Sequence, residues 1–295
     1  MDKITFYKFD GAGNDFVVID NRDGRFQATE EEVARICHRR FGVGADGLMT
    51  LESEQITVNN EQLATQAFDF EMKYYNSDGR LGSMCGNGGR CISAFAYVLG
   101  VKGSEKGVKG SERTNDGERH NCFHFRGFDG PHDAEIVMWD EERKVGIVKL
   151  GMRSVGVKDV KRCMDGWFLD TGSPHYVQRV NNLEHYDVVG EGRRIRNIVE
   201  EFPEGTNVDF IEDLPDGRLF VRTYERGVED ETWACGTGVT ACAIVSGNHS
   251  LVTRGGDFKV TFDATGDGYE NVNLIGPVAL NFVGEWELKE NPYGV

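Results

Sequence analysis

The stretch SMCGNGGRC, residues Ser83 to Cys91, places a cysteine directly before Gly-Asn-Gly-Gly, and an apolar segment follows it. A second stretch, WACGTGVTAC from Trp233 to Cys242, sets Cys235 before Gly-Thr-Gly in the same way, 150 residues later (235 − 85). Apolar residues at helical spacing predict a helix from about residue 86 to 99 and another from Cys235 to about 246. Two thiols at two helix starts therefore need a joint explanation.

The two halves of the chain share the order of elements that leads to these cysteines. FDGAGNDFVVI from Phe9 and LDTGSPHYVQRV from Leu169 both read as strand, Asp-containing glycine turn and strand. Their turns are 160 residues apart (170 − 10). This order predicts an α+β fold of two pseudo-symmetric lobes, each a mainly antiparallel sheet or barrel around a central helix. The active site is then expected in the cleft between the lobes.

The predicted boundaries follow from this repeat. Residues 1–134 are expected to form an N-terminal lobe that carries Cys85, and residues 135–280 a C-terminal lobe that carries Cys235. Residues 281–295 are expected to form a terminal strand that returns to the N-terminal lobe. Within the first lobe, residues from about 101 to 132 are rich in Gly, Ser, Lys and Glu, which predicts an exposed or partly disordered insertion.

Composition narrows the classes of partner and compartment. The chain has 295 residues, 39% of them apolar, which is enough for a sizeable core, and a formal charge of −16. Such a charge argues against nucleic acid or an anionic membrane as a partner, because both would be repelled. No apolar run is long enough to span a bilayer, and the first residues lack the apolar core of a signal peptide, so a cytoplasmic location is expected.

The cysteines do not suggest disulfides or a metal. Seven cysteines, an odd number spread over a long chain, are not typical of a secreted disulfide framework. The closest pairs, Cys85 with Cys91 and Cys235 with Cys242, lack the two-residue spacing typical of zinc sites. We expect no metal, and we interpret the five cysteines other than Cys85 and Cys235 as buried apolar residues or incidental ones.

A thiol at a helix N-terminus has a specific chemistry. The unpaired N–H groups and the helix dipole stabilise a thiolate or a bound carboxylate, which predicts a thiol pKa below the usual value of about 8.5. If two such helix starts face one another, a small carboxylate ligand fits between them, with one thiol on each side of its α-carbon. That arrangement suits removal of a proton from one face and delivery to the other, in a racemase or epimerase that needs no pyridoxal phosphate.

Six blocks carry a family resemblance, in order and across nearly the whole chain. They are YYNSDGRLGSMCGNGGRC, YERGVEDETWACGTG, GAGNDFVVID, GVGADG, GSPH and GTNVDF. Together they resemble the diaminopimelate epimerases. The resemblance implies a cofactor-independent interconversion of L,L- and meso-diaminopimelate, in lysine and peptidoglycan-precursor synthesis, by a homodimer that binds a small amino-acid substrate.

The resemblance also implies roles for individual residues. Cys85 and Cys235 are expected to be the acid/base pair, with His175 and Glu225 as modulators of pKa. Arg226 can clamp a carboxylate with its planar fork, and the asparagines suit ammonium groups and the remaining oxygens. The implied substrate-binding residues are Asn14, Asn76, Gly86, Asn87, Ser173, Asn207, Glu225, Arg226, Gly236 and Thr237. Two positions depart from the family pattern: Gly47 replaces a glutamine of some members, and Ser173 replaces a common asparagine.

Other readings of the same residues stay open. Asn14 and Asn76 lie in turns, where asparagine is common for backbone reasons, and His175 could simply pack after Pro174. A proline or hydroxyproline racemase would also use two cysteines, but it needs no second charged cluster such as the one around Arg226. A non-catalytic amino-acid-binding or redox protein on the same fold would bind ligand, or form a reversible disulfide, without turnover.

Overall fold

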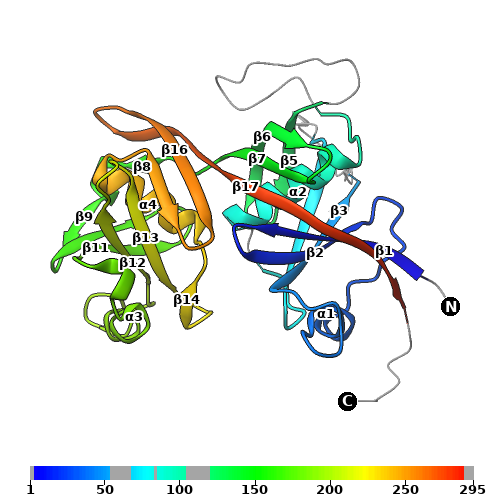
Figure 1. The fold of residues 1–295 in the computed structure, drawn as a ribbon, viewed down its shortest axis with the longest axis horizontal. Coiled ribbons are helices and arrows are strands. Elements are labelled where there is room, and N and C mark those ends of the chain that lie inside the picture. The colour runs from blue at the N-terminus through cyan, green and yellow to red at the C-terminus, as the bar shows by residue number, and fades with distance from the viewer. Residues whose placement is uncertain (1–2, 54–67, 83–84, 104–119, 289–295) are drawn as a thin grey trace, which may run out of the picture.

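The computed structural model describes residues 3–53, 68–82, 85–103 and 120–288. Two lobes lie side by side, and the long strand β17 crosses from one to the other (Figure 1). The elements of the N-terminal lobe are β1 (Lys3–Gly11), β2 (Asn14–Asp20), α1 (Glu30–Cys37), β3 (Gly47–Glu52), β4 (Phe70–Asn76), α2 (Gly86–Val98), β5 (Cys122–Gly127), β6 (Gly130–Asp140) and β7 (Val145–Gly151).

The C-terminal lobe follows a short linker after β7. Its elements are β8 (Val155–Gly156), β9 (Lys161–Cys163), β10 (Gly166–Asp170), β11 (Pro174–Arg179), α3 (Val188–Arg196), β12 (Asn207–Asp213), β13 (Leu219–Glu225), β14 (Asp230–Thr232), α4 (Gly236–Ser246), β15 (Ser250–Thr253), β16 (Gly256–Ala264) and β17 (Gly268–Glu287).

The strand pairings repeat between the lobes. In the N-terminal lobe β1–β2 is antiparallel, β2–β3 parallel, β3–β4 antiparallel and β4–β5 parallel, and β5, β6 and β7 then pair antiparallel. In the C-terminal lobe β10–β11, β11–β12, β12–β13 and β13–β15 follow the same sequence of directions, and β15, β16 and β17 again pair antiparallel. Helices α1 and α3 occupy equivalent places, as do α2 and α4. The prediction of two pseudo-symmetric α+β lobes is confirmed.

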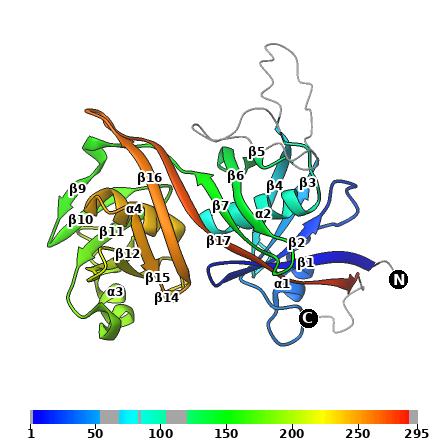
Figure 2. The same cartoon turned by 45° about the horizontal axis from the view of Figure 1, so that its top comes forward.

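Each lobe is built around one buried helix. Helix α2 buries apolar side chains such as Ile92 and Phe95 in the core of the N-terminal lobe. Helix α4 buries Val239 and Ile244 in the core of the C-terminal lobe. A helix that is apolar on nearly every side must lie inside a protein. Figure 2 shows α2 and α4 enclosed by the strands of their lobes. The outer helices α1 and α3 cover separate, smaller cores.

Part of the predicted insertion is ordinary sheet. Residues 122–127 form β5, in which Phe123 and Phe125 are fully buried, and the ring of Phe125 stacks on Phe70 at 5.0 Å. The prediction of an exposed segment is wrong there, because two alternating aromatic residues suffice to anchor a short strand that follows a polar run. Residues 104–119 of the predicted insertion lie outside the described residues.

The lobes begin and end at residues that differ from the predicted boundaries. Strands β6 and β7 pair within the N-terminal lobe, where Ile136 and Val148 join the core around α2, although the boundary at residue 134 assigns them to the other lobe. Strand β17 already pairs with β7 from Gly276 onward, and then with β1. Because β17 runs unbroken through both sheets, no local composition change marks where it passes between lobes.

Candidate active site

Both cysteines occupy the residue directly before a buried helix. Cys85 is the N-cap of α2, with φ −108° and ψ 155°, and its Sγ accepts a hydrogen bond from the Gly88 N–H at 3.2 Å. Cys235 is the N-cap of α4, and its Sγ lies 3.4 Å from Thr237 Oγ1. The predicted helix starts are confirmed. Each thiol therefore lies at a helix start, where backbone N–H groups have no partner within the helix.

The two helix starts touch through their first glycines. A Cβ placed on Gly236 would lie 3.2 Å from Gly86 Cα and 2.9 Å from Leu274 Cδ2. A Cβ placed on Gly86 would lie 3.4 Å from Gly236 Cα. A side chain at Gly236 would thus crowd the backbone of the other helix, whereas one at Gly86 would press mainly on the tip of Leu274. Two positive helix ends that meet in this way form a site for an anion, and a carboxylate is the natural one for a small amino acid.

Asn14 and Asn87 surround Cys85. Asn14, at the start of β2, has its Oδ1 4.0 Å from Cys85 Sγ and accepts from Asn87 Nδ2 at 3.4 Å. Asn87 Nδ2 also donates to the carbonyl of Ala234 at 2.9 Å, directly before Cys235. The structure therefore brings three predicted site residues together. Asn87 also links the start of α2 to the residue directly before Cys235.

Thr237 connects Cys235 to a buried histidine. His175 Nε2 lies 2.9 Å from Thr237 Oγ1, and its Nδ1 lies 2.7 Å from the carboxylate of Asp209, with both His175 and Asp209 fully buried. The carboxylate can only accept, so Nδ1 carries the proton and Nε2 is free to accept from the Thr237 hydroxyl. Thr237 Oγ1 can in turn accept from the Cys235 thiol, which gives an unbroken path for a proton.

Asn207 and Ser173 complete this side of the site. Asn207 Nδ2 donates to Ser173 Oγ at 3.2 Å, and Asn207 Oδ1 accepts from the Arg226 N–H at 2.8 Å. Ser173 Oγ is also 3.0 Å from His175 Nε2. The Arg226 guanidinium donates to the Glu204 carbonyl at 3.2 Å. Ser173 thus connects Asn207 with His175. It does so at a position where the family pattern noted in the sequence commonly has asparagine.

Burial, rather than the helix ends, dominates the thiol pKa values. Burial raises the pKa of Cys85; the Gly88 N–H opposes this, and the nearby charge of Glu225 adds to it. The pKa of Cys235 is raised well above its usual value by burial, and further by Glu225 and Asp209. Burial also raises the pKa of Glu225 itself. The expectation of lowered thiol pKa values is therefore wrong, because burial favours the protonated form of both cysteines.

Comparison with known proteins agrees with this geometry. Residues 6–112 and 167–267 match the family described as diaminopimelate epimerase. A protein of that name from Chlorobaculum tepidum is 43% identical over 248 residues, which cover 82% of this chain and 83% of the relative. Another, from Flavobacterium psychrophilum, is 39% identical over 288 residues, which cover 95% and 98%. The chain belongs to the diaminopimelate epimerase family. The family and enzyme class inferred from sequence are thereby confirmed.

More distant solved structures share the fold alone. A probable proline racemase from Agrobacterium radiobacter K84 superposes with a TM-score of 0.66 at 14% identity, covering 98% of this chain and 94% of that one. A PhzF-family phenazine biosynthesis protein from Bacillus anthracis gives 0.63 at 15% identity, covering 98% and 100%. The two-lobed architecture is therefore wider than the diaminopimelate epimerase family.

Asn76 and Gly47 lie opposite each other on neighbouring strands. They are paired in register between β3 and β4. Within the described residues, no hydrogen bond joins the Asn76 side chain to the other predicted site residues. A Cβ on Gly47 would lie 2.6 Å from both the Tyr74 ring and the Tyr75 carbonyl oxygen. Tyr74 therefore fills the space that a longer residue at position 47 would need.

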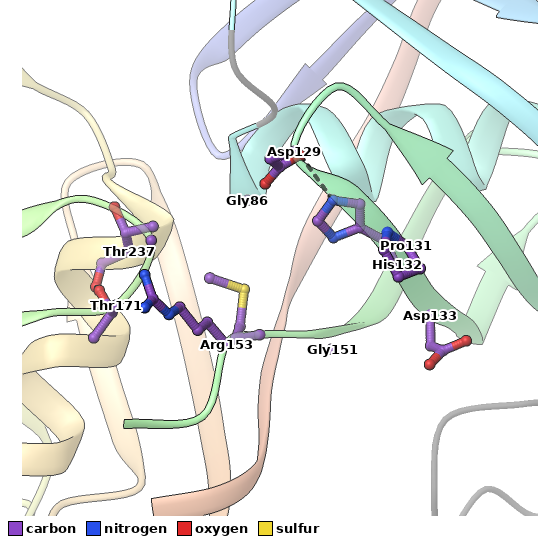
Figure 3. A pocket seen from close by; sticks show the side chains of 11 residues that line it. Gly86, Asp129, Pro131, His132, Asp133, Gly151, Arg153, Thr171 and Thr237 are labelled. Carbon is purple, nitrogen blue, oxygen red and sulfur yellow. Dashed lines mark hydrogen bonds and ion pairs between the residues drawn. The ribbon is translucent and has the colours of Figure 1, made fainter. Parts of the chain in front are cut away.

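A polar pocket of about 530 Å³ adjoins the two helix starts. Gly86 and Thr237 line it from opposite lobes, and Arg153 projects from the linker after β7 (Figure 3). Neither thiol lines this pocket, so it lies beside the helix starts rather than between the sulfur atoms. In the described part of the chain, no group of three or more His, Cys, Asp or Glu side chains is placed to hold a metal ion.

Sequence reasoning missed three residues that this diaminopimelate epimerase family member uses to build the site. Asp209 holds His175, Asp46 binds Asn14 at 2.7 Å, and the fully buried Arg90 donates to Asn87 at 3.1 Å. All three lie inside the blocks that carried the resemblance. Asp209 could have been found from its spacing, since residues 207 and 209 share one face of a strand. Arg90 lies one helical turn after Asn87 and could also have been found from its spacing, whereas the contact of Asp46 with Asn14 depends on the pairing of β2 with β3.

Proposed function

We propose that this protein epimerises L,L-diaminopimelate to meso-diaminopimelate without a cofactor, with Cys85 and Cys235 as the two acid/base groups. The observation that carries the proposal is the contact between two cysteine-capped helix starts at Gly86 and Gly236. A substrate carboxylate bound by both helix ends has its α-carbon flanked by a thiol from each lobe. Such a carbon can lose a proton to one face and gain one from the other.

Charge stabilisation comes from the backbone. As the α-proton leaves, negative charge spreads onto the carboxylate, where the N–H groups at the starts of α2 and α4 can stabilise it. Removing one such donor in other enzymes costs about 10²- to 10³-fold in rate. Asn87 and Thr237 are the second residues of their helices, so their N–H groups belong to this set.

One thiol must lose its proton before reaction. Burial favours the protonated form of both cysteines, so each is ready to act as the acid and neither as the base. A bound substrate brings an ammonium group next to the α-carbon, and a nearby positive charge lowers a thiol pKa. From Cys235, a proton can leave through Thr237 Oγ1 to His175 Nε2, along contacts of 3.4 and 2.9 Å.

The second amino-acid end of diaminopimelate needs its own polar cluster. We assign this role to Arg226, Asn207 and Glu225, because the charge of Glu225 acts on Cys235 and Asn207 binds the Arg226 backbone. An arginine fork suits the distal carboxylate, and Glu225 with the asparagines suits the distal ammonium group. A racemase for proline would have no use for this cluster.

The test is incubation of the purified protein with L,L-diaminopimelate in D₂O, with chiral chromatography and mass spectrometry of early samples. A two-base mechanism predicts deuterium in the meso product while recovered substrate stays protiated. The reason is that the thiol that delivers the hydrogen has already exchanged with D₂O. Early label in recovered substrate contradicts the two-base scheme. Turnover of proline instead, or a disulfide response without turnover, supports one of the two alternative functions.

Single-thiol variants sharpen the same assay. Cys85→Ala and Cys235→Ala should each lower epimerisation by about 10²- to 10⁴-fold, because neither thiol can serve the opposite face of the carbon. Cys242→Ala is the matched control, since this cysteine is buried within α4 and lies away from its start. An alanine variant at residue 85 or 235 with a near-normal rate contradicts the assignment.

The proposal includes a cytoplasmic homodimer. All seven cysteines are free thiols, as a reducing compartment would keep them. In the part of the chain that the structure describes, no helix has both the length and the apolar content to cross a bilayer. Phe282 and Val283 on β17 are about half exposed, which leaves apolar surface for a second copy. Analytical ultracentrifugation decides between monomer and dimer.

A further inference from the structure

A chain of hydrogen bonds with a fixed direction begins at the buried Arg90. Burial lowers the pKa of Arg90 to about 10, so the guanidinium is still charged near neutral pH and can only donate. It donates to Asn87 Oδ1 at 3.1 Å, and Asn87 Nδ2 donates to the Ala234 carbonyl at 2.9 Å. Since one partner only donates and the other only accepts, the Asn87 amide has a single orientation, with its NH₂ group toward Asn14.

The other end of the chain is fixed by a carboxylate. Asn14 Nδ2 donates to Asp46 Oδ2 at 2.7 Å, and Arg39 donates to the other oxygen, Oδ1, at 2.6 Å. A carboxylate accepts only, so it holds the Asn14 amide with the NH₂ group toward Asp46. The Oδ1 of Asn14 is thereby turned toward Asn87 and Cys85.

This orientation decides which group of the Asn14 amide faces the Cys85 sulfur. Asn14 Oδ1 lies 4.0 Å from Cys85 Sγ and accepts from the thiol. An Asn14 amide turned the other way would instead present N–H groups to the sulfur. An acceptor stabilises the protonated thiol, whereas a donor stabilises the thiolate. The direction of one carboxamide therefore selects the protonation state that Cys85 favours.

We infer that Asp46 is a positioning residue, which holds Asn14 with its amide oxygen toward the Cys85 sulfur. The inference rests on the proposed function in that Cys85 is there one of the two acid/base thiols. Through Asn14, Asp46 favours the protonated form of Cys85, which is the form that delivers a proton.

Asp46 is itself anchored by charged neighbours. Arg39 bridges Asp46 and Asp15, with 2.7 Å to the latter, and the buried Lys8 binds Asp15 at 2.5 Å. The Asp15 N–H also donates to Asp46 Oδ2 at 3.3 Å. Burial alone would raise the pKa of Asp15, but Arg39 and Lys8 lower it to about 2. Asp15 thus stays ionised near neutral pH and holds Arg39 beside Asp46.

The variant Asp46→Asn reverses the arrangement by a defined route. The charged Arg39 takes the single acceptor oxygen of the new amide, which leaves an NH₂ group facing Asn14 and gives up the long contact of 3.3 Å from the Asp15 N–H. Asn14 can then bond the new amide only through its oxygen, which turns its own NH₂ group toward Cys85 and gives up the long contact of 3.4 Å from Asn87 Nδ2. This change conserves the size of the side chain, and the Asp46 side chain is 43% exposed, so the fold should tolerate it.

The experiment measures the alkylation of Cys85 by iodoacetamide as a function of pH, with mass spectrometry of the peptide that contains it. In Asp46→Asn the curve for Cys85 should move to lower pH by about one unit, because a donor replaces an acceptor at the sulfur. In the same variant kcat/KM should fall by about tenfold to a hundredfold, mainly through kcat. Asp46→Ala, which removes the acceptor and adds no donor, should give a smaller shift.

A double-mutant cycle separates positioning from the loss of a negative charge. Removing the charge of Asp46 would by itself lower the pKa of Cys85, and this effect persists whatever occupies position 14. In an Asn14→Leu background Asp46→Asn should therefore shift the curve much less than in the wild type. Equal shifts in both backgrounds, or no shift at all, would overturn the inference. Asp20→Asn, which breaks a similar ion pair with Arg22 at 2.6 Å, controls for surface charge.

Other charged and titratable groups near Cys85 stay in place through this comparison. They are Glu225 of β13, Tyr74 of β4, Arg90 of α2 and the N–H groups of Asn87 and Gly88. The alkylation curve is read without turnover. A protein that fails to epimerise diaminopimelate would thus refute the proposed function, while the alkylation cycle would still decide the role of Asp46.

Discussion

At the scale of single residues, two opposing effects act on each thiol. The N–H groups at a helix start stabilise a thiolate, as the Gly88 contact does for Cys85, whereas burial favours the neutral form. For both thiols burial outweighs the helix end. This outcome could not be predicted from sequence, because the motif shows the helix start but not how completely the second lobe covers it.

The pH dependence of alkylation tests this balance. Only the thiolate reacts, and the pKa of Cys85 is raised, so its rate with iodoacetamide in the free enzyme should keep rising as pH increases through about 8.5. Cys235, whose side chain is more buried than that of Cys85 and whose pKa burial also raises, should react more slowly than Cys85 at each pH. A plateau near neutral pH for either thiol would mean that the helix end dominates after all.

Arg226 offers a second test at this scale. Arg226→Lys keeps the charge and loses the planar fork, so we expect KM for diaminopimelate to rise by about tenfold with a smaller change in kcat. Circular dichroism and the thermal unfolding temperature should stay close to wild type, since among the described residues the guanidinium donates only to the Glu204 carbonyl, in an exposed contact. Unchanged kinetics would remove Arg226 from the site.

At the scale of elements, the starts of α2 and α4 carry the function. The local pattern predicted both helices well, because glycine and cysteine precede long apolar runs. Thr29 caps α1, because its Oγ1 accepts from the Glu32 N–H at 3.2 Å, while the Glu32 carboxylate binds Arg35 one turn further on and Trp286 of β17. A partner as distant as Trp286 cannot be predicted from a local motif.

The contact between the helices predicts the effect of one methyl group. Gly236→Ala would place its Cβ 3.2 Å from Gly86 Cα, and backbone cannot yield as the tip of Leu274 can. We expect kcat/KM to fall by about tenfold to a hundredfold as the thiols move apart, with the protein still folded. Gly266→Ala, which would meet nothing within 4 Å, should be neutral in both assays. A fully active Gly236→Ala variant would show that the separation of the helix starts is not critical.

At the scale of the whole molecule, the repeated topology explains why the site has two equivalent halves. Each lobe brings a strand–turn–strand unit and a capped helix to the same junction, as Asn14 and Cys85 do in one lobe and Ser173 and Cys235 in the other. The offsets between motifs were enough to predict this duplication. Lobe boundaries were not predictable, because β17 belongs to both lobes and β6 and β7 return to the first.

The residues that hold the site in place depend on this long-range assembly. Asp209 reaches His175 because β11 and β12 are parallel neighbours, and Asp46 reaches Asn14 from the start of β3 beside β2. The sequence contains both aspartates in recognisable blocks, yet their partners come from pairings between segments that are distant in sequence. Candidate catalytic residues were therefore predictable, whereas their supporting contacts were not.

The facing thiols predict a reversible loss of activity on oxidation. Cys85 and Cys235 cap helices whose first residues touch, and each is free, so mild oxidation should join them into a disulfide that bridges the two lobes. Epimerisation should then disappear and return with reductant, because the bridge consumes both acid/base groups. Peptide mapping under non-reducing conditions should find the pair, and Cys85→Ser should stay in the reduced form. Another cysteine pair forming first, with loss of activity, would contradict the predicted proximity; a Cys85–Cys235 bridge that leaves activity intact would contradict their role in catalysis.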